Sequence, residues 1–402
     1  MPERPLHIGI SCFPTIGGSG IIATELGLAL AERGHSVYFV SYDTPRRFVP
    51  GERVHFYNVV VPDYPVFQRA PYALALASKL VQVATWHGLD LIHAHYALPH
   101  ATSAFLARAV LGDAAPQVIT TLHGTDVTLI GREDSYRAIT RFSLEQSAAV
   151  TAPSAWLAGA TRKELGLAES TPIDVIANFV DTERLQPRPT DPVQQAAHAA
   201  HVDGLFADDR CAAERFAGTP VLTHISNFRP VKRTLDVVHI FASVAARRPV
   251  RLLFIGDGPD RSRCEARVRE LGLAAQVRFI GLLDHVAELL PCADLLLMPS
   301  ETESFGLAAL EAASCAIPAV ASDAGGLPEV VEHGVTGFLA PVGDIEAFAS
   351  HVMTLLNDPD LRRTMGRAAR KMVCERFNLD RAVDRYEALY RRVLAAPPTT
   401  CP

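Results

Sequence analysis

Two glutamates, Glu303 and Glu311, lie eight residues apart in a stretch that follows a buried apolar strand at 293–300. The pattern predicts a helix that continues to Cys315, with Glu303 at its mouth and Glu311 roughly 12 Å further along the axis. Free N–H groups at a helix N-terminus favour an anion. The pair is therefore able to hold two ends of a diphosphate that carries a sugar at each end. Alternatively, Glu303 is an acid favoured by the helix dipole and Glu311 a solvated helix residue.

Two cations, Arg229 and Lys232, lie in a basic loop that follows a predicted strand at 221–226. Two cations near a helix N-terminus suit a diphosphate leaving group. For either charge alone, a solvated loop residue is the simpler interpretation. A Gly-Asp-Gly-Pro turn that begins at Gly256 is expected at the same sheet edge, and this convergence favours a binding pocket.

The N-terminal half has polar residues in equivalent places. A glycine-rich turn at 13–20 joins a strand at 6–12 to a helix at 21–33. Such turns let a ligand approach the main chain. His123, with Asp126 three residues later, follows the strand at 117–122 and is a candidate ligand contact.

His93 and His95 share one face of a strand at 90–96, because side chains alternate along a strand. A His-x-His pair is able to bind metal, but no third ligand is obvious nearby. The two rings therefore either face a cleft or are packed inside.

Strands and helices alternate through both halves of the chain, which predicts an α/β fold. The expected architecture is two Rossmann-like, doubly wound parallel-sheet domains facing a central cleft, with ligands at the carboxyl ends of strands. A polar, proline-bearing crossing at 178–189 marks the domain boundary. Residues 190–217 are expected to form a surface segment with short helical pieces, and residues 334–339 a hairpin-like piece.

Composition narrows the functional classes. The chain has 402 residues, of which 49% are hydrophobic and 20% charged, with a net charge of −6. This acidic balance argues against a nucleic-acid partner. No apolar run is long enough for a transmembrane helix, and the N-terminus lacks the pattern of a signal peptide. Seven cysteines without paired spacing indicate reduced thiols in a cytoplasmic protein. No metal-type cluster is evident, and Asp358-Pro359-Asp360 is interpreted as a helix-capping turn.

The spacing of Glu303 and Glu311 within Glu-Ser-Phe-Gly-Leu-x3-Glu resembles the Glu-x7-Glu signature of retaining glycosyltransferase family 4. The glycine-containing motifs at 325–329 and 334–337 resemble the same family. The resemblance implies a GT-B fold, a nucleotide-sugar donor and no metal. Fold analogy assigns residues 1–180, joined by a C-terminal helix at about 378–402, to acceptor binding. It assigns residues 181–377 to donor binding.

Motifs in and near the N-terminal half resemble one branch of that family more specifically. This branch transfers N-acetylglucosamine from UDP-N-acetylglucosamine to the hydroxyl of L-malate, with retention, in the first step of bacillithiol synthesis. The resemblance covers nearly the whole chain except about 190–220, where this chain is longer. It is carried by residues 12–20, 75–79, 93–100, 120–126 and 224–233.

The resemblance also implies roles for individual residues. His123, Lys232 and Glu303 are the candidate catalytic residues, with His123 beside the sugar, Lys232 at the diphosphate and Glu303 at the sugar hydroxyls. Asn227 stands where many family members carry an arginine for the donor phosphate. The donor-binding candidates are Gly18, Asn227, Arg229, Lys232, Gly256, Glu303, Phe305, Gly306, Leu307 and Glu311, with Glu311 at the ribose. The acceptor-binding candidates are Gly17, Gly18, Ser19, Tyr96, Thr121 and Asn227.

No side chain is a clear nucleophile, so the implied mechanism is a same-face transfer in which the leaving phosphate accepts the malate proton. Two alternatives stay open. One is a different small polar acceptor, such as an inositol phosphate or a sugar. The other is a nucleotide-sugar-binding protein without transfer activity. The sequence leaves the oligomeric state open, a homodimer included.

Overall fold

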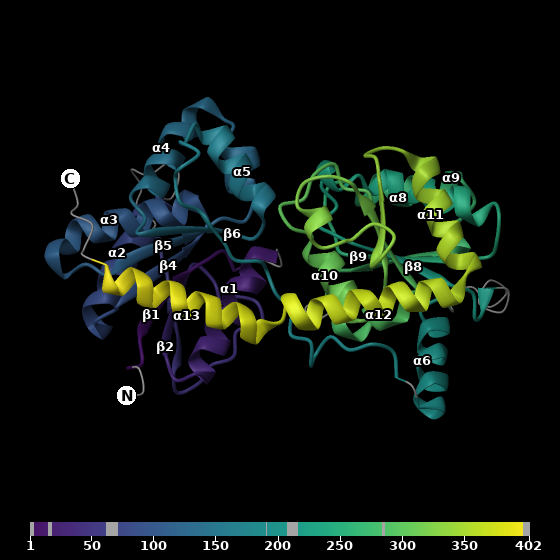
Figure 1. Cartoon of the computed structure of the whole chain (residues 1–402), viewed down its shortest axis with the longest axis horizontal. Coiled ribbons are helices and arrows are strands. Elements are labelled where there is room, and N and C mark those ends of the chain that lie inside the picture. Colours follow the sequence, from purple (N-terminus) through teal and green to yellow (C-terminus); the bar gives the residue numbers. More distant parts are fainter. Residues whose placement is uncertain are drawn as a thin grey trace. The chain divides into compact units, whose positions relative to one another are not determined.

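The computed structural model describes residues 4–14, 18–61, 71–189, 191–206, 216–283 and 286–396. The chain divides into two compact units. Unit 1 comprises residues 1–178 and 379–402, and unit 2 comprises residues 179–378. Each unit contains one parallel sheet with helices packed against it (Figure 1).

The sheet of unit 1 has the strand order β3-β2-β1-β4-β5-β6-β7, and every pair of neighbours is parallel. The chain order reverses between β1 and β4, so the loops after these two strands leave the sheet at a topological switch point, where α/β folds bind ligands. The strands are β1 (His7–Ser11), β2 (Ser36–Ser41), β3 (Val54–Asn58), β4 (Leu91–His95), β5 (Gln117–Thr121), β6 (Ala149–Ala152) and β7 (Asp174–Val175).

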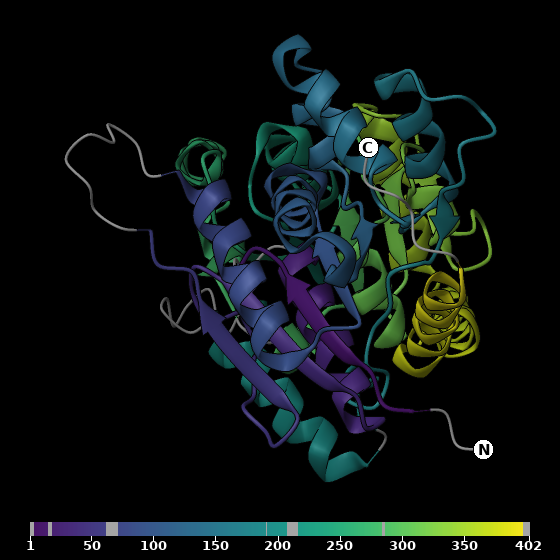
Figure 2. The same ribbon diagram turned by 90° about the vertical axis from the view of Figure 1, so that its left-hand side faces the viewer.

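Helices cover both faces of this sheet because its strands are apolar on both sides. Val40 and its neighbour Tyr38 pack with Leu80 of α2. Phe39 points to the other face, where it lies beneath α1 at Gly27. The helices of unit 1 are α1 (Gly18–Glu32), α2 (Tyr72–His87), α3 (Thr102–Leu111), α4 (Asp134–Glu145), α5 (Ala155–Leu165) and α13 (Leu379–Ala395). Figure 2 shows α2 lying over the first strands.

The C-terminal helix α13 packs against α1 in unit 1, although it follows unit 2 in the chain. Its buried stripe includes Tyr386 and Tyr390, which are four residues apart and so share one helical face. His35 and Arg33, at the end of α1, both bond Glu387 of α13 at 2.8 and 2.9 Å. The helix therefore forms part of the core of unit 1.

The sheet of unit 2 has the order β10-β9-β8-β11-β12-β13 and is also parallel throughout. Its switch point lies between β8 and β11. The strands are β8 (Val221–Ile225), β9 (Arg251–Ile255), β10 (Val277–Gly281), β11 (Leu295–Met298), β12 (Ala319–Ser322) and β13 (Gly337–Ala340). The helices are α6 (Pro192–Gly204), α8 (Thr234–Ala245), α9 (Arg261–Glu270), α10 (Leu307–Ser314), α11 (Ile345–Asn357) and α12 (Pro359–Arg376).

The structure corrects or extends three local predictions for unit 2. The hairpin expected at 334–339 is wrong, because β13 pairs in parallel with β12 after a turn in which Gly334 N–H bonds the Gly337 carbonyl. The helix expected to open near Glu303 begins only at Leu307. The surface segment after residue 190 contains a full helix, α6, which Figure 1 shows projecting from unit 2.

Candidate active site

Most of the candidate donor residues of unit 2 lie in the two loops that leave its switch point or in α10, which follows one of them, whereas Gly256 follows β9. The loop after β8 contains Asn227 and Arg229, which are both exposed, and ends in a short 3-10 turn, Pro230–Lys232. The loop after β11 contains Glu303. The Glu301 N–H donates to the Val231 carbonyl at 2.8 Å, so the two loops are bonded to each other.

Lys232 and Glu303 form a nearly buried ion pair between these loops. The Lys232 ammonium donates to both carboxylate oxygens of Glu303, at 2.7 and 2.8 Å. The Ser300 hydroxyl donates to Oε1 of the same carboxylate at 2.8 Å. The Glu303 side chain is only 10% exposed and that of Lys232 is 21% exposed. Charge-assisted hydrogen bonds are strong in low-dielectric surroundings, and they therefore hold such a pair in a fixed geometry.

Helix α10 orients the remaining residues of the Glu-x7-Glu motif. Because α10 begins at Leu307, Glu303 lies in the preceding loop and is not the first-turn acid of the alternative interpretation. Glu311 is 7% exposed, so it is not a solvated helix residue either. Phe305 is buried and packs edge-on against Phe377, with ring centroids 5.7 Å apart. Its side chain is therefore packed inside unit 2, so a contact with the donor would have to come from its backbone.

Close backbone packing explains two of the glycines. Gly325 has a φ of +64°, and a Cβ there would lie 2.1 Å from the Glu303 carbonyl oxygen. Gly256 has a φ of +120°, and a Cβ there would lie 1.8 Å from the Ser226 carbonyl oxygen. Gly256, a predicted donor contact, thus has a structural role in supporting the loop after β8.

Most of the candidate acceptor residues of unit 1 surround its own switch point. Gly18 and Ser19 begin α1, whose first N–H groups have no acceptor within the helix. Gly17 lies outside the described residues. Tyr96 follows β4 with a φ of +92°, and its ring stacks on that of His123 at a centroid distance of 5.2 Å.

Thr121 differs from the other acceptor candidates because its side chain is fully buried. Its hydroxyl lies 2.6 Å from Nε2 of His93 and 2.6 Å from the hydroxyl of Thr151. Nδ1 of His93 in turn lies 2.8 Å from the hydroxyl of Tyr390 on α13. The structure thus places Thr121 in an internal network that joins β4, β5 and α13.

His123 is half-buried and lies against the buried His95, within a cluster of histidines in unit 1. Its Nε2 lies 3.0 Å from Nδ1 of His95, and the Asp126 carboxylate accepts from the backbone N–H of His123 and Gly124. Burial lowers the pKa of His123 to about 3, and burial with neighbouring histidines lowers the pKa of His95 well below its ordinary value. Both rings are therefore neutral at physiological pH. Burial raises the pKa of Asp126 to about 6.

We assign the tautomer of His123 from the hydrogen-bond partners of His95. Nε2 of His95 is buried and has no partner among the described residues. An unpaired buried acceptor is less rare than an unpaired buried N–H. We therefore assign the proton of His95 to Nδ1, from which it donates to Nε2 of His123. This leaves the His123 proton on Nδ1, where it is able to donate to a ligand.

Sequence reasoning missed two partners of the predicted residues. Ser300 bonds Glu303. In the sequence, the only indication of this contact was that Ser300 lies at a strand end, three residues before Glu303. Tyr390 bonds His93, and here the signal was the i, i+4 pair of tyrosines in the amphipathic tail. The described residues contain no group of three or more His, Cys, Asp or Glu side chains placed to hold a metal ion. Within the same part of the chain, no helix is long and apolar enough to cross a membrane.

Comparison with known protein families gives two matches. The family described as Glycosyltransferase Family 4 matches residues 16–184, and the family described as Glycosyl transferases group 1 matches residues 207–372. Residues 185–206, which contain α6, lie between the two matched ranges.

Two relatives illustrate the range of similar sequences. N-acetyl-alpha-D-glucosaminyl L-malate synthase of Bacillus anthracis is 41% identical over 394 residues, which is 97% of each chain. 2-Deoxystreptamine glucosyltransferase of Streptomyces kanamyceticus is 31% identical over 64% of each chain.

Two solved structures share the fold. Anabaena Alr3699/HepE in complex with UDP and glucose superposes with a TM-score of 0.75 at 20% identity, covering 96% of this chain and 99% of that chain. Sucrose-phosphate synthase of Thermosynechococcus elongatus has a TM-score of 0.76 at 23% identity, covering 98% and 100%.

Proposed function

The chain belongs to the family 4 and group 1 glycosyltransferases, and from this premise we propose that it transfers N-acetylglucosamine from UDP-N-acetylglucosamine to the hydroxyl of L-malate, with retention. The predicted GT-B fold, with two parallel-sheet α/β units, is confirmed. The observation that carries the substrate assignment is 41% identity over 97% of both chains with a relative named for this product. In this proposal the reaction is the first step of bacillithiol synthesis.

Unit 2 is proposed to hold the donor. Lys232 and the first N–H groups of α10 supply positive charge for the diphosphate, while Glu303 accepts from sugar hydroxyls. The ion pair supports this assignment, because it holds the cation and the carboxylate within 2.8 Å of each other in a site that is mostly shielded from water. Glu311 is proposed to bind the ribose, and Asn227 and Arg229 to contact the phosphates from the exposed loop.

Unit 1 is proposed to hold the malate dianion. The N–H groups of Gly18 and Ser19 at the start of α1 bind one carboxylate, and Tyr96 lies at the side of the site. The network around Thr121 makes this residue a positioning residue in the proposal, in place of a direct contact. The Nδ1–H of His123 donates to the bound sugar and orients it.

The proposed chemistry is a same-face displacement. The bond between the anomeric carbon and the β-phosphate oxygen of UDP breaks, and the malate hydroxyl oxygen bonds to the same face of that carbon. The departing phosphate oxygen takes the hydroxyl proton, so no protein nucleophile is needed. Lys232 stabilises the charge that develops on the diphosphate. We further propose that the reaction needs no metal and occurs in the cytoplasm.

An acceptor panel tests the assignment. Purified protein is incubated with UDP-N-acetylglucosamine and either L-malate, inositol 3-phosphate, 2-deoxystreptamine or no acceptor, and released UDP is measured. We expect release only with L-malate, at a rate unchanged by a chelator. Release with inositol 3-phosphate but not with malate would overturn the acceptor assignment. A rate that falls to zero with the chelator would overturn metal independence.

A further inference from the structure

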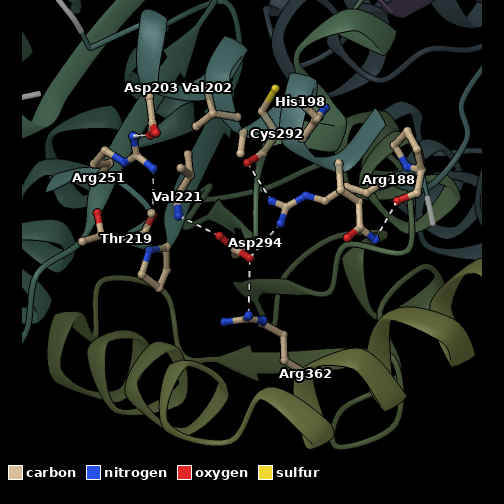
Figure 3. A pocket seen from close by; sticks show the side chains of 15 residues that line it. Arg188, His198, Val202, Asp203, Thr219, Val221, Arg251, Cys292, Asp294 and Arg362 are labelled. Carbon is tan, nitrogen blue, oxygen red and sulfur yellow. Dashed lines mark hydrogen bonds and ion pairs between the residues drawn. The ribbon is translucent and has the colours of Figure 1, made fainter. Parts of the chain in front are cut away.

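Unit 2 contains a cavity of about 420 Å³ that is separate from the candidate donor residues. It is lined by Arg188, by α6, by the first residues of β8 and β9, by the segment before β11 and by Arg362 of α12 (Figure 3). These are the amino ends of strands. Lys232 and Glu303 follow the carboxyl ends of β8 and β11. The cavity therefore lies at the opposite edge of the sheet from the proposed donor site.

Asp294 is the central acceptor of this cavity, and two guanidinium groups share it. Arg188 and Arg362 approach the same oxygen, Oδ1, at 3.3 and 3.4 Å, and Figure 3 shows both directed at it. The other oxygen accepts from the Val221 N–H at 2.8 Å. One carboxylate thus balances two cations and also anchors the start of β8.

Arg362 is the least compensated of the lining cations. Among the residues that the structure describes, its guanidinium has this one ion pair and no side-chain hydrogen bond. Arg188, by contrast, also donates to the carbonyls of Cys292 and Ala293, both at 2.7 Å. Burial lowers the pKa of Arg362, and Asp294 offsets only part of this effect. An arginine stays charged under these conditions, so the guanidinium N–H groups of Arg362 are available to bind an anion.

A third guanidinium group, that of Arg251, adds to the positive charge that lines the cavity. Arg251 is 3% exposed and bonds Asp203 at 2.7 Å. Its Nε is buried without a partner among the described residues. Three guanidinium groups and two carboxylates therefore line the cavity. Planar guanidinium groups match carboxylate and phosphate oxygens, and cavities of 300–1,000 Å³ are typical of small-molecule sites.

We propose that this cavity binds a small organic anion that carries a phosphate or carboxylate group, held by Arg362 with Arg188 and enclosed by α6. The helix that forms one wall, α6, lies in the range that neither family match covers. The proposal does not depend on the sugar-transfer reaction.

Isothermal titration of the full-length protein tests the site. Glucose 6-phosphate, citrate and inorganic phosphate are the probes, and we expect saturable binding of glucose 6-phosphate or citrate that exceeds binding of inorganic phosphate. Whichever of the two binds identifies phosphate or carboxylate as the preferred group. Arg362→Gln should weaken binding by about tenfold or more, because a charge-assisted contact is lost. Ala199→Trp, which fills the cavity from α6 without removing a charge, should abolish binding.

Two controls make the result specific. Arg363→Gln changes the neighbouring, exposed arginine of α12, which pairs with Asp360, and should leave binding unchanged. Lys232→Met removes the proposed donor cation and should also leave it unchanged. Absence of binding to all three probes would overturn the proposal. Wild-type affinity in both cavity variants, or loss of binding in Lys232→Met, would do the same.

Discussion

At the residue scale, the central feature is the bidentate contact between Lys232 and Glu303. The spacing of the two glutamates and the basic loop singled out both residues from the sequence. Their direct contact was not predictable, because it depends on how two loops 71 residues apart in the chain are bonded together. The candidate residues could therefore be identified from the sequence, whereas their pairing became visible only in the fold.

Substitution of the pair tests this assignment. Glu303→Gln removes the charge that holds Lys232, and we expect the transfer rate to fall by about 100-fold while UDP still binds. Lys232→Met should have a similar effect. Because the two residues act as a unit, the double variant should lose less than the product of the two single effects.

Glu346→Gln is the control, since Glu346 is exposed and pairs with Arg247 away from these loops; its rate should match wild type. If Glu303→Gln binds UDP normally and transfers sugar at the wild-type rate, the site assignment is wrong.

His95 is expected to act through His123. In His95→Leu no donor remains for Nε2 of His123, so its proton is free to move to that nitrogen. We expect kcat to fall by about tenfold, as for other groups that orient a histidine. His95→Asn places an amide near the position of Nδ1 and should restore most of the rate. Steady-state kinetics of both variants check this, and equal losses in the two would contradict the tautomer assignment.

At the element scale, the loop before α10 depends on the glycine turn that supports it. In Gly325→Ala the added methyl group would meet the Glu303 carbonyl at 2.1 Å, so the Glu303 loop must shift. We expect the donor KM to rise and kcat to fall, each by about tenfold, because small displacements of a positioned group are costly.

Gly334→Ala is a matched control for this change. Its φ of +77° imposes similar backbone strain, but nothing lies within 4 Å of the added Cβ. It should cost stability without changing the kinetics. If the two variants show the same kinetic parameters, the loop does not depend on close packing at Gly325. Equilibrium unfolding of both variants measures the cost of backbone strain, so that it can be told apart from the shift of the Glu303 loop.

The elements themselves were largely predictable, because apolar strands alternate with periodic helices. The start of α10 was placed too early, since the sequence gives little warning that Gly306 caps the helix with a φ of +106°. The strand β13 was mistaken for a hairpin, because its four residues follow a glycine turn and its parallel partner is distant in sequence. Helix α6 has few buried side chains, so its apolar stripe was too weak to predict a complete helix.

At the scale of the whole molecule, buried histidines make stability depend on pH. Burial lowers the pKa values of His93, His100 and His123 to about 3 from an ordinary value of 6.5, and that of His95 is also well below it. Between about pH 3 and 6.5 the unfolded chain therefore binds more protons than the folded chain. Stability rises with pH through this window and is lost as pH falls.

Each of these histidines contributes up to about 1.4 kcal/mol per pH unit to that slope. Asp126 has the opposite sign between pH 3.8 and about 6, because its pKa is raised on folding, and it offsets one histidine. Urea unfolding from pH 7 to pH 5 should show a falling free energy of unfolding. His100→Asn, which removes one titrating group, should reduce the slope. A flat profile in the wild type would contradict this account.

The most direct test of the proposed function is the structure of the product. Protein, UDP-N-acetylglucosamine and L-malate are mixed, and proton NMR follows the anomeric signal while UDP is quantified in the same sample. We predict a malate glycoside of N-acetylglucosamine with the α configuration of the donor, formed in equal amount with UDP and only when malate is present. A β-configured product, or free N-acetylglucosamine released at the same rate without malate, would contradict retaining transfer to malate.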